Sequence, residues 1–75
     1  MLESTTAVFP GTFDPFTKGH EAMVLKAIQL YSKIIIAIGK NTSKQNLFTP
    51  EERLQHIQEL FANHTSIEVK LYDGL

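Results

Sequence analysis

Residues 10–20 bring glycines, hydroxyl side chains and a histidine together in one short stretch. Gly11 allows a backbone to come close to a ligand. Gly19 directly precedes a helical pattern, where free backbone N–H groups and the positive end of the helix favour an anion. His20 would lie on the first turn of that helix, and Thr12 and Thr17 add hydroxyl groups. These residue types predict an anion site at a helix start.

The spacing matches neither of the common glycine-rich nucleotide motifs. Gly11 and Gly19 are too far apart for a P-loop, and the stretch lacks the Gly-x-Gly-x-x-Gly pattern. On residue type alone, His20 could be a plain surface histidine, and the two threonines could be turn formers. The same holds for Lys44 in a second polar stretch, because most lysines are simply solvated.

The sequence predicts no dedicated metal-binding residue. It contains no cysteine, which excludes disulfides and thiolate zinc sites. The three histidines, His20, His56 and His64, do not have the spacing of metal ligands.

Five elements would position these residues. A short β-prone run, residues 5–9, ends at Pro10-Gly11 and predicts the first strand. Apolar residues at helical spacing predict a helix over residues 19–31. Residues 33–39 contain a continuous apolar run, residues 34–38, that is rich in β-branched isoleucine and does not alternate, which is typical of a strand covered on both faces. Thr49 caps a second helix that begins at Pro50 and that Asn63 can end. Residues 66–72 alternate, which predicts a half-exposed edge strand.

The order β-α-β-α-β predicts right-handed crossovers around a parallel sheet, an α/β fold equal to half of a doubly wound domain. Ligands of such sheets bind beyond the carboxyl ends of the strands, which selects the stretches after the first two strands. At 75 residues the chain is one domain, residues 1–75. We expect it to be the N-terminal part of a larger domain, because three strands make a thin sheet; the alternative is a natural minidomain that oligomerises.

Charge and hydropathy exclude other classes of protein. Seven basic and eight acidic side chains give a formal charge of −1, which argues against nucleic-acid or anionic-membrane binding through net charge. The longest apolar run, residues 34–38, is far shorter than the roughly 18 residues of a membrane span. With Glu3 in place of a basic signal-peptide start, we expect a cytoplasmic protein.

The whole string over residues 9–20, Phe-Pro-Gly-Thr-Phe-Asp-Pro-Phe-Thr-Lys-Gly-His, closely resembles the signature of the bacterial phosphopantetheine adenylyltransferases. The resemblance continues through the second strand, the Ser43-Lys44 pair and the start of the second helix, and so covers essentially the whole chain. That family belongs to the nucleotidyltransferases with a His/Thr-x-Gly-His motif and a Rossmann-like fold. The resemblance implies transfer of an adenylyl group from ATP to 4′-phosphopantetheine, which gives dephospho-coenzyme A and pyrophosphate in coenzyme A synthesis.

The resemblance also implies roles for individual residues. His20 matches the histidine that contacts ATP phosphate and stabilises the transition state. Thr12 and Phe13 match the pair that meets ATP, and the Thr12 hydroxyl also reaches the incoming phosphate. Lys44 matches the lysine that binds phosphopantetheine. The matching glycines, which permit backbone approach, are Gly11 and Gly19. Thr17 matches the position where cytidylyltransferase relatives carry a first histidine, and Phe9 replaces the commoner tyrosine.

The chain departs from the family in length. Members run to roughly twice this chain, and the arginines that grip phosphates and a later Ser/Thr-rich motif have no match here; Arg53, the only arginine, belongs to the second helix start. We therefore expect the 75-residue chain to be inactive alone. The resemblance further implies Mg²⁺ bound with ATP and a homohexamer. The competing hypotheses are a non-catalytic nucleotide-binding or self-assembling module, and a nucleotidyltransferase with another phosphate acceptor.

Overall fold

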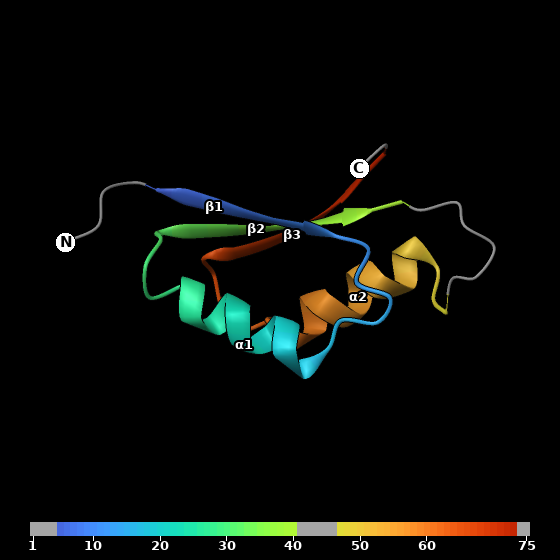
Figure 1. Ribbon diagram of the computed structural model, residues 1–75, viewed down its shortest axis with the longest axis horizontal. Coiled ribbons are helices and arrows are strands. Elements are labelled where there is room, and N and C mark those ends of the chain that lie inside the picture. The colour runs from blue at the N-terminus through green and yellow to red at the C-terminus, as the bar shows by residue number, and fades with distance from the viewer. Residues whose placement is uncertain (1–4, 41–46, 74–75) are drawn as a thin grey trace.

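The computed structural model describes residues 5–40 and 47–73. They form three strands and two helices in the predicted order: β1 (Thr6–Gly11), α1 (Lys18–Ala27), β2 (Lys33–Gly39), α2 (Pro50–Leu60) and β3 (Ile67–Tyr72). The strands form one layer, and both helices pack beneath it (Figure 1).

The sheet is parallel, with the strands in the order β1-β2-β3. In the pairing register, Phe9, Ile36 and Val69 share one row across the sheet. Because each crossover steps in the same direction and is right-handed, both helices lie on the same face. β2 lies at the centre of the sheet and β3 at its edge, which confirms the prediction of an edge strand for β3.

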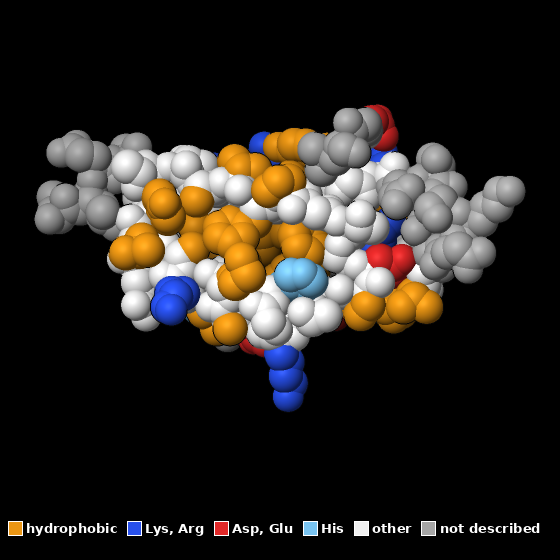
Figure 2. All heavy atoms as spheres, viewed as in Figure 1, with side chains coloured by type: hydrophobic (Ala, Val, Ile, Leu, Met, Phe, Trp, Pro, Cys, Tyr) orange, Lys and Arg blue, Asp and Glu red, His pale blue; other side chains and the backbone are white. Residues whose placement is uncertain are grey.

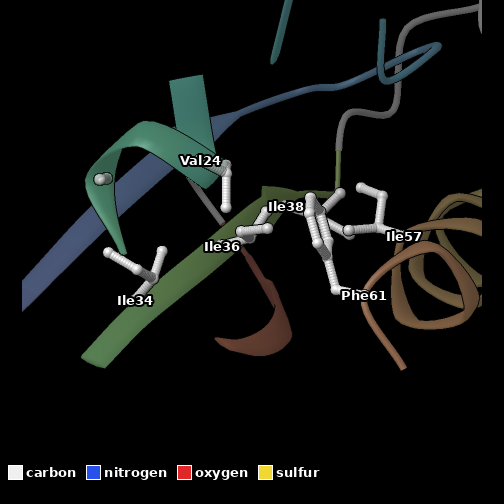
Figure 3. Packing of buried hydrophobic residues seen from close by; sticks show 7 residues of the cluster. Val24, Ile34, Ile36, Ile38, Ile57 and Phe61 are labelled. Carbon is white, nitrogen blue, oxygen red and sulfur yellow. The ribbon is translucent and has the colours of Figure 1, made fainter. Parts of the chain in front are cut away.

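The core lies between β2 and the helices. Ile34, Ile36 and Ile38 of β2 are fully buried. They point toward Val24 of α1 and toward two residues of the second helix region, Ile57 of α2 and Phe61, the C-cap residue of α2 (Figure 3). Each such side chain contributes about 1.5–3 kcal/mol by leaving water. This packing fixes the carboxyl ends of β1 and β2 against the start of α2.

The opposite face of the sheet has no helix over it among the residues that the structure describes. Val8 is 55% exposed there, and Ile35 is half-buried. The prediction that β2 is covered on both faces is therefore not met within the described residues, because the one-directional strand order places both helices on the other face.

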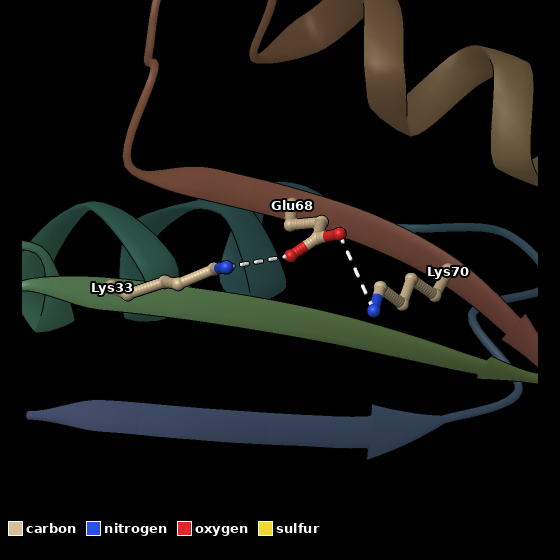
Figure 4. A network of polar contacts seen from close by, with 3 residues as sticks. All are labelled: Lys33, Glu68 and Lys70. Atoms are coloured by element: carbon tan, nitrogen blue, oxygen red, sulfur yellow. Dashed lines mark ion pairs between the residues drawn. The ribbon is translucent and has the colours of Figure 1, made fainter.

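Three charged side chains cross that open face (Figure 4). Glu68 of β3 forms ion pairs with Lys33 of β2 at 2.9 Å and with Lys70 of its own strand at 3.3 Å. The hydrogen bonds from Lys33 and then from Lys70 lower the pKa of the Glu68 carboxyl below its ordinary value.

The element ends differ from the predictions by a few residues. β1 continues through Pro10 and Gly11, since a proline is tolerated on an edge strand. α1 ends at Ala27, four residues before the predicted end at Tyr31, and the chain continues in turns whose N–H groups return to the Ala27 carbonyl. α2 ends at Leu60 rather than at Asn63. Neither helix in the described part of the chain is long and apolar enough to cross a membrane.

Candidate active site

The candidate site lies where β1 and β2 end and α1 and α2 begin. A pocket of about 320 Å³ opens between the end of β1 and α1. Its lining combines apolar side chains of β1 and α1 with four of the predicted site residues: Gly11, Thr12, Phe13 and His20. Figure 2 shows hydrophobic side chains gathered over this part of the molecule, with a histidine at the border of that area.

Thr17 is the N-cap of α1, and His20 is its partner in a capping box. The Thr17 hydroxyl accepts a hydrogen bond from the His20 backbone N–H at 3.3 Å, and Nδ1 of His20 accepts one from the Thr17 backbone N–H at 2.9 Å. The helix therefore begins at Lys18, one residue before the predicted start. The sequence signal was a threonine three residues before a histidine that takes the place of the usual Glu or Gln.

This cap determines which nitrogen of His20 carries the proton. A backbone N–H can only donate, so Nδ1 must be the acceptor, and the neutral ring then carries its proton on Nε2. Nε2 is left as a hydrogen-bond donor at the first turn of α1, where the remaining backbone N–H groups and the helix dipole also favour an anion.

Two phenylalanines hold the His20 ring. The ring of Phe13 meets it edge-on at 5.0 Å between centroids, and that of Phe16 lies 5.2 Å away at a tilt of 39°. Phe16 also contacts the buried ring of Phe61 at 5.8 Å, which links this cluster to the core. His20 is therefore positioned by packing as well as by its hydrogen bond.

Gly11 is required by the packing of the loop. A Cβ atom at this position would lie 2.8 Å from the Cζ atom of Phe13, which is too close for the ring to remain where it is. Phe13 itself has a φ of 52°, in the left-handed region that few non-glycine residues adopt. Gly19 differs, because a Cβ atom there would meet only the Thr17 hydroxyl, at an ordinary 3.7 Å.

Asp14 joins this loop to the segment before α2, a role that the sequence did not indicate. Its two carboxylate oxygens accept hydrogen bonds from the backbone N–H groups of Leu47 and Phe48, at 2.7 and 2.9 Å. The bonds connect residues more than thirty positions apart, so a pattern of neighbouring residues could not reveal them.

Arg53 is the second residue that the site analysis from sequence missed. Only 1% exposed, it donates from Nη1 to the Thr12 carbonyl at 2.6 Å and to the Gly39 carbonyl at 3.3 Å. A signal was present, because position 53 lies one helical turn before Ile57 on the buried stripe of α2, where an arginine is unusual.

The structure thus brings Gly11, Thr12, Phe13 and His20 to one pocket, with Gly19 beside them on the first turn of α1. Lys44, the predicted phosphopantetheine ligand, lies outside the described residues. Within residues 5–40 and 47–73, no three His, Cys, Asp or Glu side chains are grouped so that they could hold a metal ion.

Comparison with known proteins identifies the family. The Cytidylyltransferase-like family model matches residues 8–74. The phosphopantetheine adenylyltransferase of Maridesulfovibrio salexigens is 45% identical over 74 residues, which are 99% of this chain and 45% of that protein. Those of Cytophaga hutchinsonii and Levilactobacillus brevis are each 44% identical, over 96% and 95% of this chain and 48% and 44% of their own length. The chain spans about half the length of these curated relatives.

Solved structures share the fold. The bifunctional NMN adenylyltransferase/ADP ribose pyrophosphatase from Francisella tularensis matches with a TM-score of 0.79 and 31% identity, over 95% of this chain and 23% of that one. The NadR protein in complex with NR matches with a TM-score of 0.84, over 93% of this chain and 20% of that one. Because its sequence identity is only 19%, this match shows the fold alone. These matches confirm the predicted βαβαβ arrangement. The family model, which matches most of the chain, shows that the chain belongs to the Cytidylyltransferase-like family.

Proposed function

We propose that this chain carries the nucleotide-phosphate site of a phosphopantetheine adenylyltransferase. In the proposed reaction, a phosphate oxygen of 4′-phosphopantetheine attacks the α-phosphorus of ATP. A new P–O bond forms, the bond to the β-phosphate oxygen breaks, and pyrophosphate leaves with that electron pair. The products are dephospho-coenzyme A and pyrophosphate.

The observation that carries the proposal is the hydrogen bond from the Thr17 backbone N–H to Nδ1 of His20. With Nδ1 accepting from Thr17, Nε2 is a preorganised N–H donor at a helix N-terminus, next to a pocket that Thr12 also lines. A donor held in place before the reaction stabilises the charge that develops on the α-phosphate without first reorganising. Phosphoryl-type transfer depends mainly on such positioning and charge stabilisation.

Other residues complete the proposed site. A phosphate monoester is mostly dianionic at neutral pH, so the acceptor needs no general base. The Thr12 hydroxyl aligns the attacking oxygen, and Lys44 binds phosphopantetheine. Gly19 has no side chain to block the space where its Cβ atom would lie, which supports close approach of phosphate to the first turn of α1. Magnesium enters as MgATP, the substrate, because Mg²⁺ is held mainly by phosphate oxygens and water.

The proposal also includes a cytoplasmic homohexamer, as the family resemblance implies. Size-exclusion chromatography with light scattering measures the oligomeric state directly. A monomer at the concentrations used for the assay would remove this part of the proposal without affecting the chemistry.

The test measures adenylyl transfer in a full-length protein that contains this chain. His20→Ala and Lys44→Ala are each expected to lower turnover by about 10²- to 10³-fold, the usual cost of one preorganised donor. His56→Ala is the control, since His56 is exposed on α2 and its ring packs on Phe48. If both site variants kept turnover within about threefold of wild type, the assigned roles would be wrong.

A different phosphate acceptor is the second candidate function. The 31% identity to the Francisella tularensis protein, whose name includes NMN adenylyltransferase, favours nicotinamide mononucleotide as that acceptor. Turnover with a panel of acceptors decides between them: 4′-phosphopantetheine, nicotinamide mononucleotide and glycerol phosphate. A kcat/KM that is highest for nicotinamide mononucleotide would replace the first proposal with the second. ATP binding without turnover of any acceptor would instead favour a binding module.

A further inference from the structure

Arg53 connects three separate parts of the molecule. Nη1 donates to the carbonyl of Thr12, after β1, and to that of Gly39, at the end of β2. Nε donates to the carbonyl of Thr49, the N-cap of α2, at 3.4 Å. Nη2 is buried and has no hydrogen-bond partner among the described residues. One planar group therefore sets the relative position of all three carbonyls.

The shortest of these bonds fixes the orientation of one peptide unit. The peptide between Thr12 and Phe13 is planar and trans, so its N–H points away from its C=O. Because the carbonyl is turned inward to Arg53 at 2.6 Å, the Phe13 N–H is turned away from the guanidinium. This orientation coincides with the left-handed φ of Phe13, a conformation that needs support from its surroundings.

A purely stabilising role does not account for the type of residue chosen. Within the described residues, the buried Arg53 forms no ion pair with a carboxylate, so its positive charge is met there only by the dipoles of backbone carbonyls. Removing such a charge from water costs free energy of desolvation, and an apolar residue could fill the same place on the buried face of α2 without that cost. A cation is favoured if anionic phosphate binds nearby.

We infer that Arg53 is a positioning residue of the nucleotide site: it holds the Thr12–Phe13 peptide so that the Phe13 N–H and the Thr12 side chain keep the orientation that ATP phosphates require. The inference rests on the proposed function for the identity of the ligand. It concerns the orientation of the loop, which can be measured without turnover.

The test compares Arg53→Lys with Ile57→Val in the full-length protein. Lysine keeps the charge but cannot reach three carbonyls with a planar fork. Ile57 is buried on the same helix one turn further on, so its truncation weakens packing alone and is the matched control. Three quantities are measured: the thermal midpoint, the amide hydrogen-exchange rates of Thr12 and Phe13 by NMR, and KM for ATP with kcat.

We expect Arg53→Lys to raise both the exchange rate of the Phe13 amide and the KM for ATP by about tenfold, the effect of losing one charge-assisted hydrogen bond. Ile57→Val should leave the Phe13 exchange rate and the KM for ATP unchanged, even if it lowers the thermal midpoint as much as Arg53→Lys does. Equal behaviour of the two variants in exchange and KM would overturn the inference.

A variant that does not fold still leaves a decisive measurement on the wild-type protein. The Nη1 hydrogens of Arg53 should exchange slowly, and their NMR signals should shift when ATP is added. Signals that do not change on addition of ATP would overturn the inference. A wild-type protein that transfers no adenylyl group would overturn the proposed function instead, and the exchange rates in the variants would still decide the role of Arg53.

Discussion

Nδ1 of His20 accepts a hydrogen bond from the backbone N–H of Thr17 at 2.9 Å, so one ring nitrogen caps α1 while Nε2 takes no part in the cap. The bond closes the capping box that starts α1. The same bond places the proton of the neutral ring on Nε2. Helix capping and preparation of the donor are thus a single structural feature.

Replacing His20 with asparagine separates these two roles. The asparagine carbonyl can accept the Thr17 N–H in place of Nδ1, but the variant has no donor at the position of Nε2. We expect the free energy of unfolding to change by less than about 1 kcal/mol and turnover to fall by about 10²- to 10³-fold. Chemical denaturation and the adenylyl-transfer assay measure the two effects, with His56→Asn as the control. Turnover near the wild-type value would show that Nε2 has no part in the reaction.

Gly11→Ala is expected to destabilise the protein. The added Cβ would lie 2.8 Å from the Phe13 Cζ, so the ring must move, and His20 packs on that ring. Overpacking of this kind costs about 1–3 kcal/mol. Urea denaturation measures the loss, and a crystal structure of the variant should show both rings displaced. Unchanged stability with unmoved rings would mean that the loop accommodates the methyl group elsewhere.

Gly19→Ala should have the opposite effect on stability. Its Cβ fits the folded chain, and alanine favours the helix over glycine by up to about 1 kcal/mol. If phosphate approaches the first turn of α1, the same methyl group should weaken ATP binding by about tenfold. Calorimetric titration with ATP checks this second effect. A more stable variant with wild-type affinity would place the phosphates away from this turn.

The stability of the protein should depend on Glu68 at acidic pH. Lys33 and Lys70 lower its pKa in the folded protein, so its stabilising contribution is present above the ordinary carboxyl pKa and is lost as the pH falls through the lowered folded value. Glu68→Gln should therefore lose less stability than wild type between about pH 5 and pH 2. Thermal unfolding across this range measures the difference, with Glu59→Gln as the control. Identical pH profiles for wild type and Glu68→Gln would show that the ion pairs contribute nothing in solution.

The sequence predicted the fold well because its signals were local. The isoleucine-rich apolar run of β2 and the Thr-Pro-Glu start of α2 each correspond to an element of the structure. The element ends were less accurate, since hydrogen bonds in the turns after Ala27 ended α1 early. Whether helices cover both faces of β2 depends on the order of the strands in the sheet. The apolar pattern of a single strand does not reveal that order.

The predicted site was incomplete for a similar reason. His20, Thr12 and Gly11 were found because they follow one another in one loop. Asp14 and Arg53 act across more than thirty positions of the chain, on the Phe48 N–H and the Thr12 carbonyl. Such contacts appear only once β1, β2 and α2 are assembled.

The central claim is that the loop after β1 and the first turn of α1 bind nucleotide phosphates. Titration of the ¹⁵N-labelled chain with MgATP, followed by NMR, tests it most directly. The account predicts that the largest amide shifts cluster at Thr12, Phe13, Gly19 and His20 and that His20→Asn reduces them. Shifts that cluster instead at β3 or at the end of α2, or that are the same in His20→Asn, would contradict it.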